Sequence, residues 1–257
     1  MRYLIAAHTD IGIKKKTNQD SYMIKEAQTK RGRVCLCVLC DGMGGLSSGE
    51  LASATVIRAF EQWFETQFPV LLSDFSFERL KEQWIHITEE LNQRLAAHTA
   101  GTGHRMGTTL AGLLLMENHY YIINVGDSRV YALLDQVYQL TKDQSLVQQQ
   151  IDLGRLSPEQ AEIHPQRNVL LQCIGASDAV MPDFYEGAVH PGTLFLLCSD
   201  GFRHVVSEDE IYMQLAPDSL RDEQTMKERL VWLTELEKAR MEVDNISSVT
   251  VKVGQEE

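Results

Sequence analysis

The sequence predicts a single domain of the α+β class, and three observations point to that class. The chain has 257 residues, of which 44% are hydrophobic, so it can bury a sizeable core. Short apolar runs joined by tight polar connections lie between residues 108 and 140 and are typical of antiparallel strands. Apolar residues recur at three- and four-residue intervals in residues 49–68 and 80–95, which predicts two amphipathic helices that pack on a sheet.

Three short strands, separated by polar turns, are predicted in the first forty residues. They cover residues 4–7, 21–26 and 34–40. In the third of these, Cys35, Cys37 and Cys40 lie in an alternating apolar run, which indicates a buried strand. We favour structural cysteines over a zinc site, because no second Cys/His pair at zinc spacing accompanies them.

The apolar runs that follow the two helices are predicted to form one antiparallel meander. They cover residues 110–116, 120–125, 130–134 and 137–140. Capping boxes, apolar runs and amphipathic spacing mark the remaining elements. These are a short helix at 157–163, a strand at 193–198, a capping box at 207–210, a long helix at 221–241 and a strand at 248–253. No repeat, low-complexity tract or Pro-, Gly- or Ser-rich linker interrupts the chain, so residues 1–257 are expected to be one domain.

Composition and charge exclude several classes of function. The net charge of −12 repels a nucleic-acid backbone, so no nucleic-acid partner is expected. No stretch reaches the roughly 20 apolar residues that span a bilayer, so we expect no membrane partner. Five cysteines, an odd number, without an apolar leader and cleavage site, favour a reducing, cytoplasmic location. Because no sensor domain or membrane anchor is evident, we expect a stand-alone regulator.

Aspartates recur where predicted strands end or begin, beside a glycine, serine or asparagine. They are Asp41, Asp127, Asp200 and Asp244, and Asp20 follows an Asn-Gln pair. Each one alone is explained by the preference of aspartate for turns. Five gathered carboxylates, however, stay ionised only with cations between them, and ligand sets without His or Cys favour Mg²⁺ or Mn²⁺. Two such ions bridged by one carboxylate can activate water and hold a phosphate for attack.

The order and spacing of these motifs resemble those of the bacterial type 2C, metal-dependent protein phosphatases. The motifs read Asp-Ile-Gly at 10–12, Asn-Gln-Asp-Ser at 18–21, Asp-Gly-Met-Gly-Gly at 41–45, Gly-Glu at 49–50, Met-Gly-Thr-Thr at 106–109, Gly-Asp-Ser-Arg at 126–129, Cys-Ser-Asp-Gly at 198–201 and Asp-Asn-Ile-Ser at 244–247. The segment at about 144–180, with its His-Pro-Gln-Arg-Asn-Val-Leu run at 164–170, resembles the family's mobile flap beside the active site. The resemblance covers nearly the whole chain.

The resemblance implies a four-layer α-β-β-α sandwich of two antiparallel sheets flanked by helix pairs, within one catalytic domain. It implies a protein serine/threonine phosphatase that hydrolyses phosphoserine and phosphothreonine in one step, by attack of a metal-bridged hydroxide. The substrates would be phosphorylated proteins, the partner would be a cognate bacterial serine/threonine kinase, and the chain would be a monomer.

The metal ligands of the family also carry over to this sequence, residue by residue. The resemblance implies that Asp41 bridges two ions of Mg²⁺ or Mn²⁺, with the carbonyl oxygen of Gly42 on one of them. Asp200 and Asp244 would hold the other ion. Asp127 resembles the aspartate that, together with Asp200, binds a third and weaker ion in bacterial members.

Two further residues have expected roles in the reaction. Asp20 would act on the metals or their waters, as the acidic residue of the family at that position does. Lys15 stands where bacterial members usually carry the arginine that clamps the substrate phosphate, so Lys15 is expected to bind phosphate. Lysine supplies charge without the planar fork of arginine, which predicts a lower substrate affinity. Lys14 or Lys16 could reach the phosphate instead.

A second departure concerns the general acid. Leu46 stands where many relatives have a histidine, so a metal-bound water is the candidate proton donor, with His164, His104 and His8 as alternatives. Two other functions remain open on these residues. One is a catalytically weak or inactive phosphatase fold that binds phosphoproteins as a regulator, and the other is a hydrolase of small phosphate esters.

Overall fold

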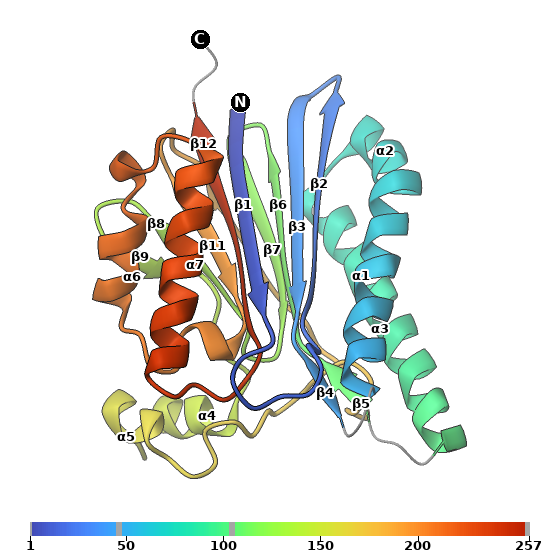
Figure 1. Cartoon of the computed structure of the whole chain (residues 1–257). Coiled ribbons are helices and arrows are strands. Elements are labelled where there is room, and N and C mark those ends of the chain that lie inside the picture. The colour runs from blue at the N-terminus through green and yellow to red at the C-terminus, as the bar shows by residue number, and fades with distance from the viewer. Residues whose placement is uncertain (1, 45–47, 103–105, 255–257) are drawn as a thin grey trace.

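Two five-stranded antiparallel sheets lie face to face in the computed structural model, which describes residues 2–44, 48–102 and 106–254 (Figure 1). In spatial order, the first sheet consists of β1 (Arg2–Asp10), β12 (Ile246–Gly254), β11 (Leu194–Cys198), β8 (Arg129–Leu133) and β9 (Val137–Gln139). The second sheet consists of β10 (Asp183–Ala188), β7 (His119–Val125), β6 (Leu110–Met116), β3 (Gly32–Cys40) and β2 (Ser21–Thr29). A separate antiparallel pair consists of β4 (Gly42–Gly44) and β5 (Met106–Thr108).

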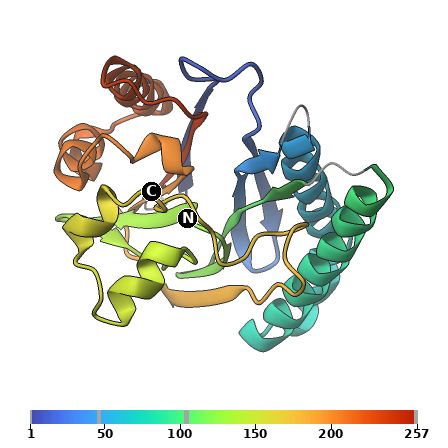
Figure 2. The ribbon, with the colours of Figure 1, turned by 90° about the horizontal axis from the view of Figure 1, so that it is seen from below.

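Helices cover the outer face of each sheet, so the molecule has four layers (Figures 1 and 2). The second sheet is covered by α1 (Ser48–Thr66) and α3 (Phe77–Thr102), and the first by α6 (Glu208–Leu215) and α7 (Glu223–Ala239). The shorter helices are α2 (Phe68–Leu71), α4 (Leu146–Asp152) and α5 (Pro158–Glu162). This arrangement confirms the expected α-β-β-α sandwich. No helix within the described ranges is both long and apolar enough to cross a bilayer.

Strand β3 shows how an unbroken apolar run is buried on both faces. Cys35 and Cys37 pack between the sheets, in a cluster that includes Val249 of β12. Val38 and Cys40 point to the other side and pack beneath α1 and α3. Because β3 is an interior strand between two apolar layers, each face needs hydrophobic residues. All three cysteines are completely buried, which confirms the predicted buried strand.

Aromatic side chains hold α1 against α3. The ring centroids of Trp63 and Trp84 are 5.6 Å apart, and Phe60 lies 6.2 Å from Trp84. Trp63 Nε1 donates to Oε1 of Gln83 at 2.7 Å, so the indole N–H is satisfied at the edge of the layer. The two amphipathic stretches predicted from spacing therefore form one packed helix layer.

Local sequence signals set several helix ends. Both predicted capping boxes are formed, since Ser157 and Ser207 exchange hydrogen bonds with Gln160 and Glu210 respectively. They begin α5 and α6 where the sequence predicts. The long helix α7 begins later than predicted, because the Asp222 carboxylate accepts from the N–H of Thr225 and caps the first turn.

The predicted single meander is wrong, because its hairpins belong to different sheets. Strands β6 and β7 pair in the second sheet, whereas β8 and β9 pair in the first. The chain changes sheets after β7, at Gly126, whose φ of 96° favours glycine. Apolar periodicity could not reveal the change, since both hairpins face the same core between the sheets. The sequence also failed to predict α4 and β10, which lack long apolar runs.

Candidate active site

The five predicted aspartates lie next to strand ends, at one end of the sandwich. Antiparallel pairing aligns Cys40 with Ser21, Cys198 with both Ser248 and Arg129, and Asp10 with Ile246. The ends of β1, β3 and β11 are therefore level with the starts of β2, β8 and β12, and the connecting loops gather there. Figure 2 shows the molecule from this end.

Asn245 ties the loops of this end together. Its Nδ2 donates to the carbonyl oxygens of Ile11 and Thr17 at 2.9 and 3.2 Å. Its Oδ1 accepts from the N–H of Gln19 at 2.9 Å. A Cβ on Gly201 would overlap the carbonyl oxygen of Asn245, so this loop contact requires glycine. Three loops that are distant in sequence are thus held in fixed contact.

Asp20 is buried, with one carboxylate oxygen paired and the other bare. Ser199 Oγ donates to Oδ2 at 2.9 Å, whereas Oδ1 is buried without a hydrogen-bond partner. Desolvation, reinforced by the charges of Asp200 and Asp244 and opposed by serine hydrogen bonds, raises the pKa of Asp20 to about 7. A buried carboxylate oxygen without a hydrogen-bond partner is energetically costly unless a positive group contacts it.

Asp41 is positioned by its backbone. Its N–H donates to Oγ1 of Thr109, and its carbonyl oxygen accepts from Oγ1 of Thr108 and from the N–H of Thr109, each at 2.9 Å. The next residue, Gly42, donates its N–H to the carbonyl oxygen of Gln19 at 3.2 Å. Desolvation, followed by the charges of the other four aspartates, raises the pKa of Asp41 well above its usual range. The five carboxylates therefore form one electrostatic cluster with Asp41 inside it.

Asp127 faces a buried guanidinium. Nη2 of Arg203 lies 3.8 Å from Oδ2 of Asp127 and donates to the carbonyl oxygen of Asp127 at 3.0 Å. Asp143 accepts from Arg203 at 3.4 Å and from two nitrogens of Arg129 at 2.7 and 2.8 Å. Desolvation and the charge of Asp200 raise the pKa of Asp127 to about 7 in spite of Arg203. This carboxylate thus has a partial counterion within the chain.

Asp200 lies in a short 3₁₀ turn directly after β11. Its Oδ2 is 3.4 Å from Nε2 of His204, and its Oδ1 is buried without a hydrogen-bond partner. His204 Nδ1 in turn lies 3.2 Å from Oε2 of Glu242. One oxygen of Asp200 therefore contacts His204, and the other has no hydrogen-bond partner.

Asp244 is paired with Lys15. The ammonium of Lys15 lies 2.6 Å from Oδ1 of Asp244, which also accepts from the N–H of Asn245 at 2.8 Å. Burial alone would lower the pKa of Lys15, but the hydrogen bond to Asp244 and the charges of Asp41 and Asp200 outweigh it and raise the pKa. The structure thus brings Lys15 to the aspartate cluster.

The donor chemistry of the cluster fits a hard divalent cation. The five side chains offer only oxygen donors, they repel one another, and Asp20 and Asp200 each carry a bare buried oxygen. Within the ranges that the structure describes, however, no three Asp, Glu, His or Cys side chains converge closely enough to hold an ion. The carboxylates are instead engaged by a serine, an imidazole, an ammonium and a guanidinium. Metal ligation by these residues stays a prediction.

Four side chains that surround the cluster were not predicted from the sequence. They are Ser199, Arg203, His204 and Glu242. Three of them flank the predicted Asp200, and the fourth lies two residues before Asp244. That adjacency is the signal that could have identified them, but sequence alone does not show which neighbours of an aspartate turn toward it.

The alternatives considered for the general acid lie elsewhere or are not described. Nδ1 of His8 lies 3.3 Å from Nζ of Lys227 on α7. Nδ1 of His164 accepts from the N–H of Gln166 at 3.1 Å in a turn after α5. Leu46 and His104, together with Gly45 of the Asp-Gly-Met-Gly-Gly motif, lie outside the described residues.

The predicted flap segment starts beside the cluster. Gln144 exchanges two hydrogen bonds with Gly126, next to Asp127: its N–H donates at 2.9 Å and its Oε1 accepts at 2.8 Å. The segment then contains α4 and α5 and folds back so that Leu171 N–H donates to the carbonyl oxygen of Gln144. Its mobility stays a prediction.

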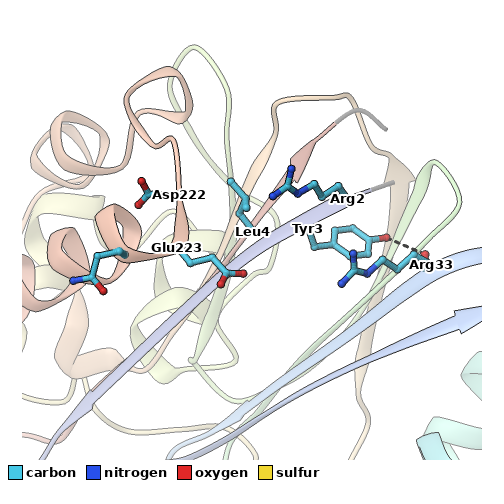
Figure 3. A pocket seen from close by; sticks show the side chains of 7 residues that line it. Arg2, Tyr3, Leu4, Arg33, Asp222 and Glu223 are labelled. Atoms are coloured by element: carbon cyan, nitrogen blue, oxygen red, sulfur yellow. Dashed lines mark hydrogen bonds between the residues drawn. The ribbon is translucent and has the colours of Figure 1, made fainter. Parts of the chain in front are cut away.

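A pocket of about 500 Å³ lies at the opposite end of β1 from this cluster (Figure 3). Arg2 and Arg33 line it together with Asp222 and Glu223, and Tyr3 OH donates to the carbonyl oxygen of Arg33 at 3.2 Å. Its positive and negative side chains balance one another. We assign no chemistry to this pocket.

The chain is similar in sequence to known protein phosphatases over most of its length. The family model described as Protein phosphatase 2C matches residues 12–242. Protein phosphatase PhpP of Streptococcus pneumoniae is 35% identical over 210 residues, which are 80% of this chain and 82% of PhpP. Serine/threonine phosphatase stp of Listeria innocua is 31% identical over 250 residues, which are 95% of this chain and 93% of stp.

Solved structures are similar over almost the full length. The Streptococcus agalactiae serine/threonine phosphatase superposes with a TM-score of 0.84 at 29% identity, covering 98% of this chain and 100% of that one. The catalytic domain of the phosphatase PstP in complex with two manganese ions has a TM-score of 0.78 at 29% identity, covering 98% and 99%.

Proposed function

Because this chain belongs to the protein phosphatase 2C family and is a protein serine/threonine phosphatase, we propose that its aspartate cluster works with two divalent cations, Mg²⁺ or Mn²⁺. The reaction is hydrolysis of phosphoserine and phosphothreonine in phosphorylated protein substrates. The related PstP structure with two manganese ions supports this choice of ion.

One observation carries the proposal. Desolvation, followed by the charges of Asp20, Asp200, Asp127 and Asp244, raises the pKa of Asp41 well above the usual range. Such a cluster is costly unless cations neutralise it. A site built only to bind phosphate would instead place cations of the chain, rather than five acids, at its centre.

The ligand assignment is the one that the resemblance to the family implies, residue by residue. Asp41 would hold both ions, the carbonyl oxygen of Gly42 would contribute to one of them, and Asp200 and Asp244 would hold the other. Asp127, with Asp200, is the place for a third ion, which would bind weakly because the Arg203 guanidinium already lies 3.8 Å from Asp127. Oxygen donors throughout suit Mg²⁺ and Mn²⁺.

When bound, the cations supply an activated water as the nucleophile and positive charge beside the phosphate. Asp20 orients water at the cluster through its bare Oδ1, while Ser199 fixes its Oδ2. Lys15 lies at the cluster with a side chain that is 38% exposed, so its ammonium can reach a phosphate oxygen of an entering substrate. As a point donor it grips less firmly than a guanidinium would.

The wider assignment rests on the fold. We propose that residues 1–257 act as one catalytic domain with a flap at about 144–180, since Gln144 anchors this segment beside Asp127. The chain would act as a monomer in the cytoplasm and oppose a bacterial serine/threonine kinase. The kinase is expected because removal of phosphate from proteins presupposes an enzyme that adds it.

The test is phosphate release from a phosphothreonine peptide, measured with Mn²⁺, with Mg²⁺ and with a chelator. We expect turnover only with a divalent cation and none from Asp41→Asn. Sugar phosphates serve as the comparison substrates and should be hydrolysed far more slowly. Phosphopeptide binding without turnover, unaffected by chelator, would show instead a regulator that binds phosphoproteins.

A further inference from the structure

His204 and Glu242 connect the two aspartates that we assign to the same ion. Nε2 of His204 lies 3.4 Å from Oδ2 of Asp200, and its Nδ1 lies 3.2 Å from Oε2 of Glu242. The other oxygen of Glu242, Oε1, accepts from the N–H groups of Val243 and Asp244 at 2.7 and 2.9 Å. A continuous chain of contacts therefore runs from the Asp200 carboxylate to the Asp244 backbone.

Both bridging side chains are held in place by burial. The side chains of His204 and Glu242 are 10% and 4% exposed, so neither can exchange its partners freely for water. The contact with His204 engages one oxygen of Glu242, and the N–H groups of Val243 and Asp244 engage the other. Glu242 is thus fixed as the anchor of the bridge.

The bridge also selects which oxygen of Asp200 is available. The imidazole engages Oδ2, whereas Oδ1 is left buried and without a partner. A carboxylate with one oxygen fixed and one bare has lost most of its rotational freedom before any ion arrives. Such preorganisation by neighbouring groups raises the affinity of a metal site.

The bridge adds a side-chain connection between two loops that also meet where Gly201 contacts Asn245. Asp200 follows β11 and Asp244 precedes β12, so the two lie far apart in the chain although β11 and β12 are paired. Their carboxylates also carry like charges at the same end of the sandwich, so they repel each other when both are ionised. Without a connection of this kind, repulsion would favour separation of the two side chains.

We propose that His204 and Glu242 are positioning residues that hold Asp200 and the Asp244 loop in place for one divalent cation, and so raise the affinity of this site. The inference rests on the proposed function, because it takes Asp200 and Asp244 as ligands. Neighbouring-group substitutions around metal ligands typically weaken binding by about 10- to 100-fold, and we expect an effect of this size.

The test measures the affinity of the whole chain for Mn²⁺, by the loss of the paramagnetic resonance signal of free Mn²⁺ and by calorimetry. His204→Ala and Glu242→Ala should each weaken Mn²⁺ binding at one site by about 10- to 100-fold. Glu242→Gln keeps an oxygen that can accept from the backbone N–H groups, so it should retain most of the affinity. His8→Ala removes another half-buried histidine beside α7 and should leave Mn²⁺ affinity unchanged.

A double-mutant cycle separates positioning from general damage. If His204 acts through Asp200, then His204→Ala should weaken Mn²⁺ binding much less on an Asp200→Asn background than alone. The chelator-treated variants should keep the circular dichroism spectrum of the unaltered protein. If the circular dichroism spectrum shows that His204→Ala is misfolded, the difference in Mn²⁺ affinity between Glu242→Ala and Glu242→Gln tests the proposal instead.

The outcomes distinguish this inference from the proposed function. Unaltered protein that binds Mn²⁺ normally, together with a folded His204→Ala that binds equally well, would overturn the positioning role alone. Failure of the unaltered protein to bind Mn²⁺ would overturn the proposed function and this inference with it.

Discussion

The ammonium of Lys15 lies 2.6 Å from Oδ1 of Asp244, so a cation of the chain itself contacts one of the proposed metal ligands. Both side chains are partly exposed, at 38% and 26%, so ions and substrate can reach the pair. The residue proposed to bind phosphate is therefore in direct contact with the cluster proposed to bind metal.

Replacement of Lys15 tests the phosphate-binding role. We expect Lys15→Met to lower kcat/KM for a phosphothreonine peptide by about tenfold or more, since a hydrogen bond to a charged group contributes about 1.5–3 kcal/mol. Lys15→Arg should lower KM, because a guanidinium grips two phosphate oxygens. Steady-state kinetics at saturating Mn²⁺ check both. The role belongs to a neighbour if Lys14→Met or Lys16→Met, and not Lys15→Met, raises KM.

Asp41→Asn should abolish activity and yet stabilise the metal-free protein. Its carboxylate lies among four like charges, so an uncharged amide of the same shape relieves repulsion. In chelator we expect the free energy of unfolding to rise by about 1 kcal/mol or more, because one unit of raised pKa is equivalent to about 1.4 kcal/mol. Urea unfolding checks this, and a lower stability than the unaltered protein would contradict a repulsive cluster.

The metal-free protein should lose stability as the pH rises. Unfolded aspartates titrate near pH 3.9, whereas Asp20 and Asp127 in the fold have a pKa of about 7. Between about pH 4 and 7 the folded state therefore retains protons that the unfolded state releases, and stability falls across this window. We expect chelator-treated protein to unfold at lower urea at pH 8 than at pH 5, and Mn²⁺ to restore stability at pH 8. Equal midpoints at the two pH values would contradict the raised pKa values.

Removal of the buried Asp143 carboxylate, which contacts Arg203 as Asp127 does, should cause a large loss of stability. Asp143→Ala leaves the guanidinium groups of Arg129 and Arg203 without their shared carboxylate, and breaking a buried pair in this way costs about 3–5 kcal/mol. Asp74→Ala is the matched control, since its ion pair with Arg79 is at the surface and its side chain is 83% exposed. Urea unfolding should show a large shift for the first variant and no measurable shift for the second.

Much of the fold could be predicted because hydrophobic spacing is a local signal. The run at Cys35, Cys37 and Cys40 indicated a strand buried on both faces, and the capping boxes at Ser157 and Ser207 placed two helix starts. The exchange of sheets at Gly126 could not be predicted in this way. An apolar residue on β7 and one on β8 face the same core between the sheets, so their patterns look alike although their hydrogen-bond partners differ.

The sequence by itself determined which side chains could bear the chemistry: the aspartates that adjoin strand ends, with no histidine or cysteine among them, and a lysine nearby. Only the tertiary structure decided how these side chains are engaged. Ser199 holds Asp20, His204 braces Asp200, Lys15 pairs with Asp244, and Arg203 faces Asp127. The apolar pattern of a strand depends on whether each of its residues is buried, which is a local property. A contact between two loops depends instead on the pairing of strands that lie far apart in the chain.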